Sequence, residues 1–172
     1  MQKKYWGWQS RKRNLMDKGA IFSPCRTWRY TLWRIWYPHR DRIVFIGLNP
    51  STADENVNDR TITRLIKFAY YWGYGGMYML NIFAFRSTDP KGLTSYPDPV
   101  GPDNDKYIHE TCKKPYTRKV VAAWGNHGKL FNRAKIVRDN IPNLYCFRVT
   151  KQGEPEHPLY LKKDTQLIRL ED

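Results

Sequence analysis

The run RIVFIGLNPS at residues 42–51 decides the fold of this chain. Residues 42–48 are almost wholly apolar, as expected of a strand at the centre of a sheet with both faces buried. Asn49 and Pro50 then end the strand, because both residue types favour turns. Buried strands of this kind are typical of α/β proteins, whose ligand sites form beyond the carboxyl ends of the strands. The run therefore predicts a central strand with the start of a site directly after it.

The segments on either side of this run extend the sheet and cover it. Residues 27–36 (TWRYTLWRIW) are rich in strand-favouring side chains, and a turn at residues 37–41 separates them from the central strand. We expect these two strands to form an antiparallel pair. After the run, Asn58 and Asp59 can cap a helix over residues 60–72. Apolar residues in that segment recur at the three-to-four spacing of one helix face.

Further strands alternate with helices along the rest of the chain. Strands are predicted at residues 77–85, 119–124 and 144–149, helices at 103–113 and 125–140, and a proline-rich irregular stretch at 86–103. This alternation predicts a single α/β domain over residues 1–172. We expect a three-layer α/β/α sandwich around a mostly parallel four-stranded sheet, with an extra N-terminal strand or hairpin. Residues 1–20 would form a basic, aromatic arm.

The charge of the chain favours a polyanionic partner. Lys and Arg number 30 against 16 Asp and Glu, which gives a formal net charge of +14 at pH 7. Nucleic acid is the commonest such partner, and we expect a monomer that binds DNA rather than RNA. A basic surface that only aids solubility, or that meets a ribosome or membrane, is the alternative. Arg26, Arg29 and Arg34 lie among aromatic residues and either contact phosphates or form a solvated strand face.

The cysteines and the hydropathy pattern exclude several other classes of protein. Cys25, Cys112 and Cys146 lie far apart with no C-x-x-C pair, so the ligand set of a zinc ribbon or an iron–sulfur cluster is missing. The N-terminus lacks the apolar segment of a secretion signal. No stretch is long and apolar enough to span a membrane. We expect reduced thiols, no metal or organic cofactor, no membrane partner and a cytoplasmic location.

Polar side chains gather at four predicted strand ends. Asn49 follows the first central strand and Asn81 lies within the second. Asn126 and His127 follow the third strand, and His157 lies just beyond the fourth. Each has an ordinary structural explanation on its own, such as turn formation or the satisfaction of backbone groups. Because the ends of parallel strands meet at one sheet edge, we interpret these residues together as a site.

In order and spacing, these segments resemble the motifs of the uracil-DNA glycosylase superfamily. GLNPS at residues 47–51 resembles the water-activating loop of its mismatch-specific branch, and MLN at 79–81 resembles the strand whose Asn reads an extruded base. VVAAWG at 120–125 and HPL at 157–159 resemble a later strand and the His-Pro loop of that superfamily. Over residues 25–161 the chain most closely resembles a family of proteins of unknown function, DUF1643.

The glycosylase resemblance implies a role for each group. Asn49 would hold the attacking water, and His157 would stabilise negative charge on the departing base. Asn81 would pair with the edge of the extruded base. The remaining candidates are Phe83, Trp124 and Leu48 for contacts to the base, and Ser51, Thr52, Asn126, Leu159, Tyr160, Arg26 and Arg29 for phosphate or DNA contacts, with Leu159 or Tyr160 as the wedge that fills the vacated stack.

The chain departs from the glycosylase pattern where a carboxylate would activate the water, because Asn49 stands there. Asp54 or Asp59 can supply the carboxylate, although Asp59 is favoured as a helix cap. Three functions follow. The favoured one is an enzyme that flips out a modified or mismatched pyrimidine in DNA and cleaves its N-glycosidic bond. The alternatives are group transfer to or from a modified base, and a protein that only binds a base or nucleotide.

Overall fold

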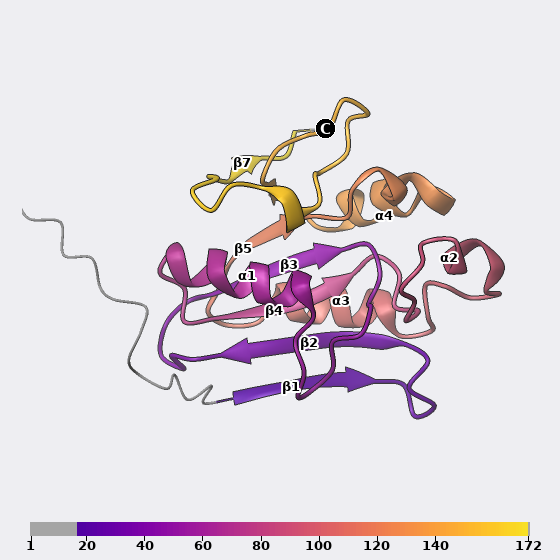
Figure 1. The fold of residues 1–172 in the computed structure, drawn as a ribbon, viewed down its shortest axis with the longest axis horizontal. Coiled ribbons are helices and arrows are strands. Elements are labelled where there is room, and N and C mark those ends of the chain that lie inside the picture. Colours follow the sequence, from indigo (N-terminus) through magenta and orange to yellow (C-terminus); the bar gives the residue numbers. More distant parts are fainter. Residues whose placement is uncertain (1–16, 172) are drawn as a thin grey trace, which may run out of the picture.

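One mixed β-sheet organises the domain. The computed structural model describes residues 17–171, apart from the side chain of Tyr160, and its strands pair in the order β1-β2-β4-β3-β5-β6-β7 (Figure 1). The four central strands β4, β3, β5 and β6 are parallel, whereas β1, β2 and β7 run antiparallel to their neighbours. The strands are β1 (Asp17–Phe22), β2 (Arg29–Ile35), β3 (Arg42–Gly47), β4 (Gly76–Asn81), β5 (Thr117–Ala122), β6 (Tyr145–Cys146) and β7 (Ile168–Arg169), and the helices are α1 (Arg60–Tyr71), α2 (Gly92–Ser95), α3 (Asn104–Cys112), η1 (Asn126–Asn132), α4 (Arg133–Asn140) and η2 (Pro158–Tyr160).

The predicted α/β class is confirmed, but the sheet is wider and more mixed than expected. It has seven strands in the described part of the chain, where a mostly parallel four-stranded sheet was predicted. The first two predicted strands, now β2 and β3, do not pair, because β4 lies between them. The backbone amides of Trp36 and Tyr37 both donate to the carbonyl oxygen of Gly75, which ties the end of β2 to the start of β4. Residues 1–16 of the predicted arm lie outside the described residues, and the arm's last four residues belong to β1.

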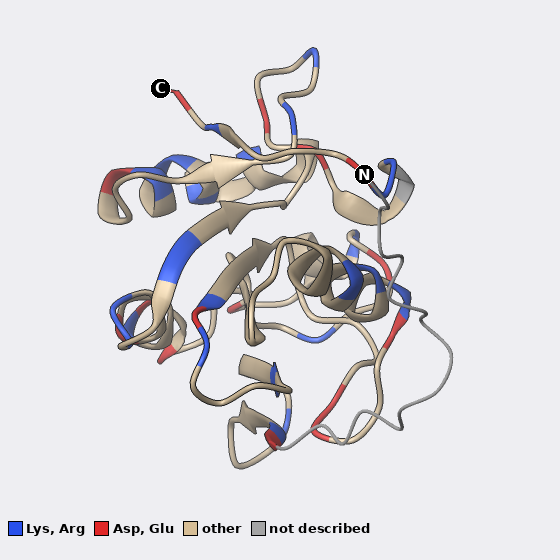
Figure 2. Cartoon of the chain, turned by 90° about the vertical axis from the view of Figure 1, so that its left-hand side faces the viewer, with Lys and Arg blue, Asp and Glu red and all other residues tan. Residues whose placement is uncertain are grey.

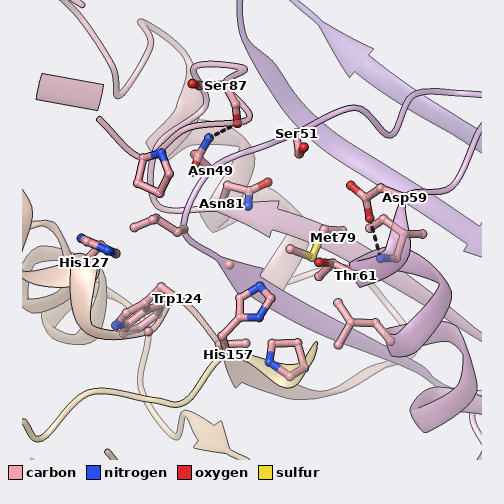
Figure 3. Close-up of a pocket in the computed structure, with 18 of the residues that line it drawn as sticks. Asn49, Ser51, Asp59, Thr61, Met79, Asn81, Ser87, Trp124, His127 and His157 are labelled. Atoms are coloured by element: carbon pink, nitrogen blue, oxygen red, sulfur yellow. Dashed lines mark hydrogen bonds between the residues drawn. The ribbon is translucent and has the colours of Figure 1, made fainter. Parts of the chain in front are cut away.

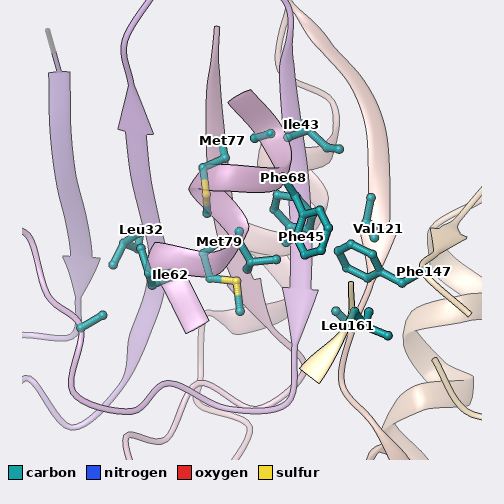
Figure 4. Packing of buried hydrophobic residues seen from close by; sticks show 14 of the residues in the cluster. Leu32, Ile43, Phe45, Ile62, Phe68, Met77, Met79, Val121, Phe147 and Leu161 are labelled. Carbon is teal, nitrogen blue, oxygen red and sulfur yellow. The ribbon is translucent and has the colours of Figure 1, made fainter. Parts of the chain in front are cut away.

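Both faces of the sheet are buried, as the apolar run predicted. Along β3, Ile43 and Phe45 face one cluster of buried side chains, and Val44 and Ile46 face the other. Helix α1 packs against the first face, where Phe147 lies 4.8 Å from Phe68 and 6.2 Å from Phe45 between ring centroids (Figure 4). Helices α3 and α4 contribute to the cluster on the second face. The central strands are thereby held on both sides, which fixes the positions of their carboxyl ends.

Local signals explain where the helices begin and break. Asp59 caps α1 through a bond from the Ile62 amide to its carboxylate at 2.8 Å, as the sequence predicted. The helix predicted over residues 125–140 is divided into η1 and α4 instead, because Leu130 is extended and Phe131 has a φ of +50°. The strand predicted over residues 144–149 keeps only the two residues of β6 in the sheet. Its neighbour Phe147 turns into the aromatic cluster, and the chain leaves the sheet there.

Candidate functional site

A cavity of about 480 Å³ lies where the chain leaves β3, β4 and β5. Its position agrees with the rule that sites in α/β sheets form beyond the carboxyl ends of the strands. The side chains of Asn49, Asn81, Asp59, Trp124 and His157 surround a common space, although they come from segments far apart in the sequence (Figure 3). The predicted site residues that line the cavity are Arg29, Leu48, Asn49, Ser51, Asn81, Trp124, Asn126 and His157.

Asn81 forms part of the floor of this cavity. It ends β4 and is only 1 % exposed. Its Oδ1 accepts a hydrogen bond of 3.1 Å from a guanidinium nitrogen of Arg29, whereas its Nδ2 is buried without a partner among the described residues. A Cβ atom on Gly47 would lie 3.0 Å from that Nδ2, so glycine at the end of β3 leaves room for the amide. The floor therefore presents an amide donor that the protein leaves unbonded.

Arg29 lies behind Asn81 and is also buried, at 2 % exposure. Burial lowers the pKa of its guanidinium to about 10, so the group remains a cation at neutral pH. Its Nη1 donates to the carbonyl oxygen of Ala53 at 2.9 Å, and its Nε has no hydrogen-bond partner within residues 17–171. No acidic side chain described by the structure lies within salt-bridge distance of it. The cavity floor thus carries an unneutralised positive charge.

Arg34, five residues further along β2, has a different role. It is fully buried, and its Nε donates to Asn58 Oδ1 at 2.8 Å while its Nη2 donates to the Asp54 carbonyl oxygen at 2.6 Å. Arg29 and Arg34 together hold the loop between β3 and α1 against β2. Neither belongs to a solvated strand face, and burial rules out a direct contact between Arg34 and a phosphate on the surface.

The amide of Asn49 is held in one orientation. Its Nδ2 donates to the backbone carbonyl oxygens of Pro50 at 3.1 Å and Ser87 at 2.8 Å. Since both donor hydrogens are used, the side chain offers its Oδ1 to whatever occupies the cavity. An amide fixed in this way can accept a hydrogen bond from a water molecule or a ligand.

His157 faces the cavity from the opposite side to Asn49 (Figure 3). Its Nδ1 accepts a long hydrogen bond of 3.4 Å from the backbone amide of Leu159, so in the neutral ring the proton is on Nε2. Burial lowers the pKa of the imidazole below its usual value, and the negative charge of Asp59 opposes this effect. The segment is held at the end of β5 by a bond of 2.8 Å from the Gly125 amide to the Pro155 carbonyl oxygen. A neutral imidazole that donates from Nε2 is therefore available.

The structure also places Asp59 on the cavity wall, where Asp54 is not found. One oxygen of Asp59 caps α1, as described above. The Asp54 carboxylate instead accepts the backbone amides of Asn56 and Val57 at 2.8 and 2.7 Å, which stabilises a turn and lowers its pKa. The sequence offered Asp54 or Asp59 as the carboxylate of the site and favoured a capping role for Asp59. The sequence does not show that the start of α1, where Asp59 lies, is beside the end of β3 and so at the cavity.

Of the other predicted contacts to a base or to DNA, Phe83 and Leu159 do not line the cavity, and Trp124 lines it with almost no exposed surface. Phe83 is fully buried in the core, with an edge contact to Phe131, so it cannot stack on a ligand there. Trp124 lines the wall but is 1 % exposed, and its Nε1 donates to Glu154 at 2.8 Å. Leu159 is half-buried beside the site, and the side chain of Tyr160 lies outside the described part of the structure.

A second, shallower hollow adjoins the cavity and shares Ser51, Ser87 and Thr88 with it. It contains the predicted phosphate contacts Arg26 and Thr52, together with Arg86, which the sequence analysis did not single out. Arg26 is exposed and paired with Glu55 through two hydrogen bonds of 3.0 and 2.8 Å. Elsewhere, Lys and Arg are spread over strands, helices and loops rather than confined to one element (Figure 2).

Two further findings concern metal ligands and membrane-spanning helices. Within residues 17–171, no group of three or more His, Cys, Asp or Glu side chains is arranged to hold a metal ion. In the same range, every helix is too short or too polar to cross a membrane.

Comparison with known proteins identifies a family but no activity. The model of a family described as "Protein of unknown function (DUF1643)" matches residues 29–159, which is more than half of the chain. No curated protein and no solved structure matches the chain significantly. The resemblance to uracil-DNA glycosylases thus receives no support from these comparisons, whereas the resemblance to DUF1643 does. The chain belongs to the DUF1643 family of proteins of unknown function.

Proposed function

We propose that the cavity takes up a pyrimidine base extruded from DNA and that the protein cleaves the N-glycosidic bond of that nucleotide. The observation that carries this proposal is the Asn81 amide, which is buried, unbonded at Nδ2 and placed between Asn49 and His157. An unsatisfied buried donor costs free energy unless a ligand accepts its hydrogen bond. A ring carbonyl oxygen of a pyrimidine can accept this hydrogen bond. The cavity volume of about 480 Å³ lies within the usual range for small-molecule sites, so the ring itself can fit.

The groups around Asn81 fit the charges that develop in glycosidic hydrolysis. The oxygen of a water molecule attacks the sugar carbon, the carbon–nitrogen bond breaks, and the electron pair leaves with the base. Asn49 Oδ1 holds the water, since the amide nitrogen is fixed by two backbone carbonyls. Asp59 accepts the proton that the water loses. His157 donates from Nε2 to a base oxygen and so stabilises the negative charge on the departing base.

The adjoining hollow gives the nucleic-acid strand a place beside the cavity. It is lined by the guanidinium groups of Arg26 and Arg86 and by the hydroxyl groups of Ser51 and Thr52. Cationic and hydroxyl side chains are the usual partners of backbone phosphates. Because Ser51 lines both spaces, a phosphate in the hollow would lie next to a base in the cavity.

The test is mass spectrometry of bases released from DNA that carries uracil, mismatched thymine or 5-substituted pyrimidines. Wild type is compared with Asn49→Ala and His157→Ala, and with His109→Ala as a matched control, since His109 is an exposed residue of α3 outside the cavity. We expect a free base from wild type and the control, with a loss of about 100-fold or more in the two site variants. Equal release by all four proteins contradicts the assignment of the residues. DNA binding without release contradicts hydrolysis, and absence of binding contradicts the DNA-directed function.

A further inference from the structure

Arg29 differs from the other buried arginines in how its charge is compensated. Arg133 is 4 % exposed and forms two hydrogen bonds with the carboxylate of Asp105, the shorter at 2.6 Å. Arg34 is surrounded by four backbone carbonyl oxygens and by Asn58. Arg29 has only the Ala53 carbonyl and the Asn81 amide oxygen as partners within the described residues, and no carboxylate. A buried cation without an anionic partner is strongly unfavourable in a folded protein.

We propose that the Arg29–Asn81 floor binds an oxyanion, a carboxylate or phosphate group carried by the ligand of this cavity. The cation lies on the cavity wall, so a ligand can neutralise it without unfolding the chain. That the ligand is a base with a charged substituent rests on the function proposed above. The proposal adds a chemical class to that function, since uncharged pyrimidines leave Arg29 without a counter-charge.

The hydrogen bond between Arg29 and Asn81 fixes which atoms the floor offers. The guanidinium of Arg29 donates to Asn81 Oδ1 at 3.1 Å. Rotating the side-chain amide by 180° would place the Asn81 NH₂ group against the N–H groups of Arg29, where neither can accept a hydrogen bond. Asn81 is thus locked with Nδ2 as its free group, next to Gly47. Both unpartnered atoms of the floor, Asn81 Nδ2 and Arg29 Nε, are donors. A group with several acceptor oxygens and a negative charge matches a floor of donors and a cation.

The nearest acidic residues do not take the place of such a ligand. Asp59 and Asp54 act on Arg29 only through space, and burial of the guanidinium outweighs their effect on its pKa. One carboxylate oxygen of each is bonded elsewhere, that of Asp59 to the first turn of α1 and that of Asp54 to a neighbouring turn. Arg29, a residue of the cavity wall, thus has no carboxylate bonded to its guanidinium group within residues 17–171.

The first measurement is isothermal titration calorimetry of the wild-type protein with three probes at neutral pH. Thymidine supplies a neutral base, 5-carboxy-2′-deoxyuridine supplies the same ring with a carboxylate, and inorganic phosphate supplies an oxyanion alone. We expect the carboxylated nucleoside to bind at least 10-fold more tightly than thymidine. Equal affinities for the two nucleosides overturn the oxyanion proposal and leave base binding intact. Binding of phosphate without either nucleoside supports the oxyanion site and contradicts the nucleobase function, and failure of all three probes to bind contradicts both.

A pair of isosteric variants tests the site from the protein side. Asn81→Asp places a carboxylate oxygen against Arg29, so it neutralises the cation internally. We expect this variant to melt at a higher temperature than wild type without ligand and to lose the 10-fold preference for the carboxylated nucleoside. Asn104→Asp is the matched control, because Asn104 is buried outside the cavity and its Nδ2 donates to the carbonyl oxygens of Asn81 and Ile82. The control should melt at a lower temperature, and a lower melting temperature for Asn81→Asp as well would overturn the proposal.

Discussion

Asp59 combines two roles that a pair of substitutions can separate. Its carboxylate accepts the Ile62 amide at 2.8 Å and so caps α1, and the same side chain contributes negative charge to the cavity wall. Asparagine keeps an oxygen acceptor but no charge, whereas alanine removes both. Asp59→Asn should therefore preserve the cap and change the cavity, while Asp59→Ala should change both.

The expected loss of stability follows from the capping geometry. Losing the capping bond costs about 1 kcal/mol, and losing a negative charge at the helix N-terminus costs about 0.5 kcal/mol. In a domain of this size, 1 kcal/mol corresponds to a shift of about 2–4 °C in Tm. Asp59→Ala should thus lower Tm by about 3–6 °C, because it removes both contributions. Asp59→Asn should lower Tm by about 1–2 °C, because only the charge is lost.

Thermal unfolding followed by circular dichroism measures these shifts, and an NMR titration of His157 reports the charge. Because Asp59 raises the pKa of His157, both variants should lower that pKa further and to the same extent. Asp103→Ala is the matched control, since Asp103 precedes α3 in the same position but makes no capping bond through its side chain. A Tm loss in the control as large as in Asp59→Ala would refute the capping argument, and an unchanged His157 pKa in both variants would refute the electrostatic one.

The shifted pKa values of His157 and of two cysteines give the remaining predictions. Because burial lowers the pKa of His157 in the folded state, its neutral form favours folding above the usual imidazole pKa of 6.5, and this contribution is lost as the pH falls through the lower folded value. Chemical denaturation between pH 5 and 8 should accordingly show a flatter pH dependence for His157→Gln than for wild type, and identical slopes would contradict the assignment. Hydrogen bonds with the hydroxyls of Ser23 and Thr27 lower the pKa of the exposed Cys25 thiol to about 7, whereas burial raises that of Cys112 to about 12. Iodoacetamide at pH 7.5 should then alkylate Cys25 at least 10-fold faster than Cys112, and peptide mass spectrometry that finds equal rates would show that these environments do not control reactivity.

The features predicted correctly from the sequence depend on short-range patterns. The apolar run at residues 42–48 indicates a strand buried on both faces, and its side chains do alternate between two clusters. The Asp59 cap and the face of α1 follow from local spacing in the same way. The rule that sites form beyond the carboxyl ends of parallel strands predicted a common site for Asn49, Asn81 and His157, and all three line the cavity.

The features that the sequence did not reveal depend on contacts between distant segments. The insertion of β4 between β2 and β3 is a matter of pairing partners, and strand propensity carries no information about them. From their place among aromatic residues, Arg29 and Arg34 were interpreted either as phosphate contacts or as part of a solvated strand face. In the structure both are buried, and the loop after β3 supplies a carbonyl oxygen to each guanidinium group, Ala53 to Arg29 and Asp54 to Arg34. Phe83 was taken for a stacking wall from its position alone, whereas its side chain points into the core.

The two guanidinium groups of β2 also determine which part of the cavity can move. Opening the cavity by lifting the loop before α1 would break the bonds to Ala53, Asp54 and Asn58 at once. Hydrogen bonds from charged donors are worth about 1.5–3 kcal/mol each, so such an opening would be rare. Amide hydrogen exchange in this loop should then follow unfolding of the hairpin formed by β1 and β2. The segment that carries His157, on the opposite wall, is held by bonds from the Gly125 amide to the Pro155 carbonyl oxygen at 2.8 Å and from the Glu156 amide to the Arg148 carbonyl oxygen at 2.9 Å. A conformational change that admits a large ligand on that side would have to break these bonds instead.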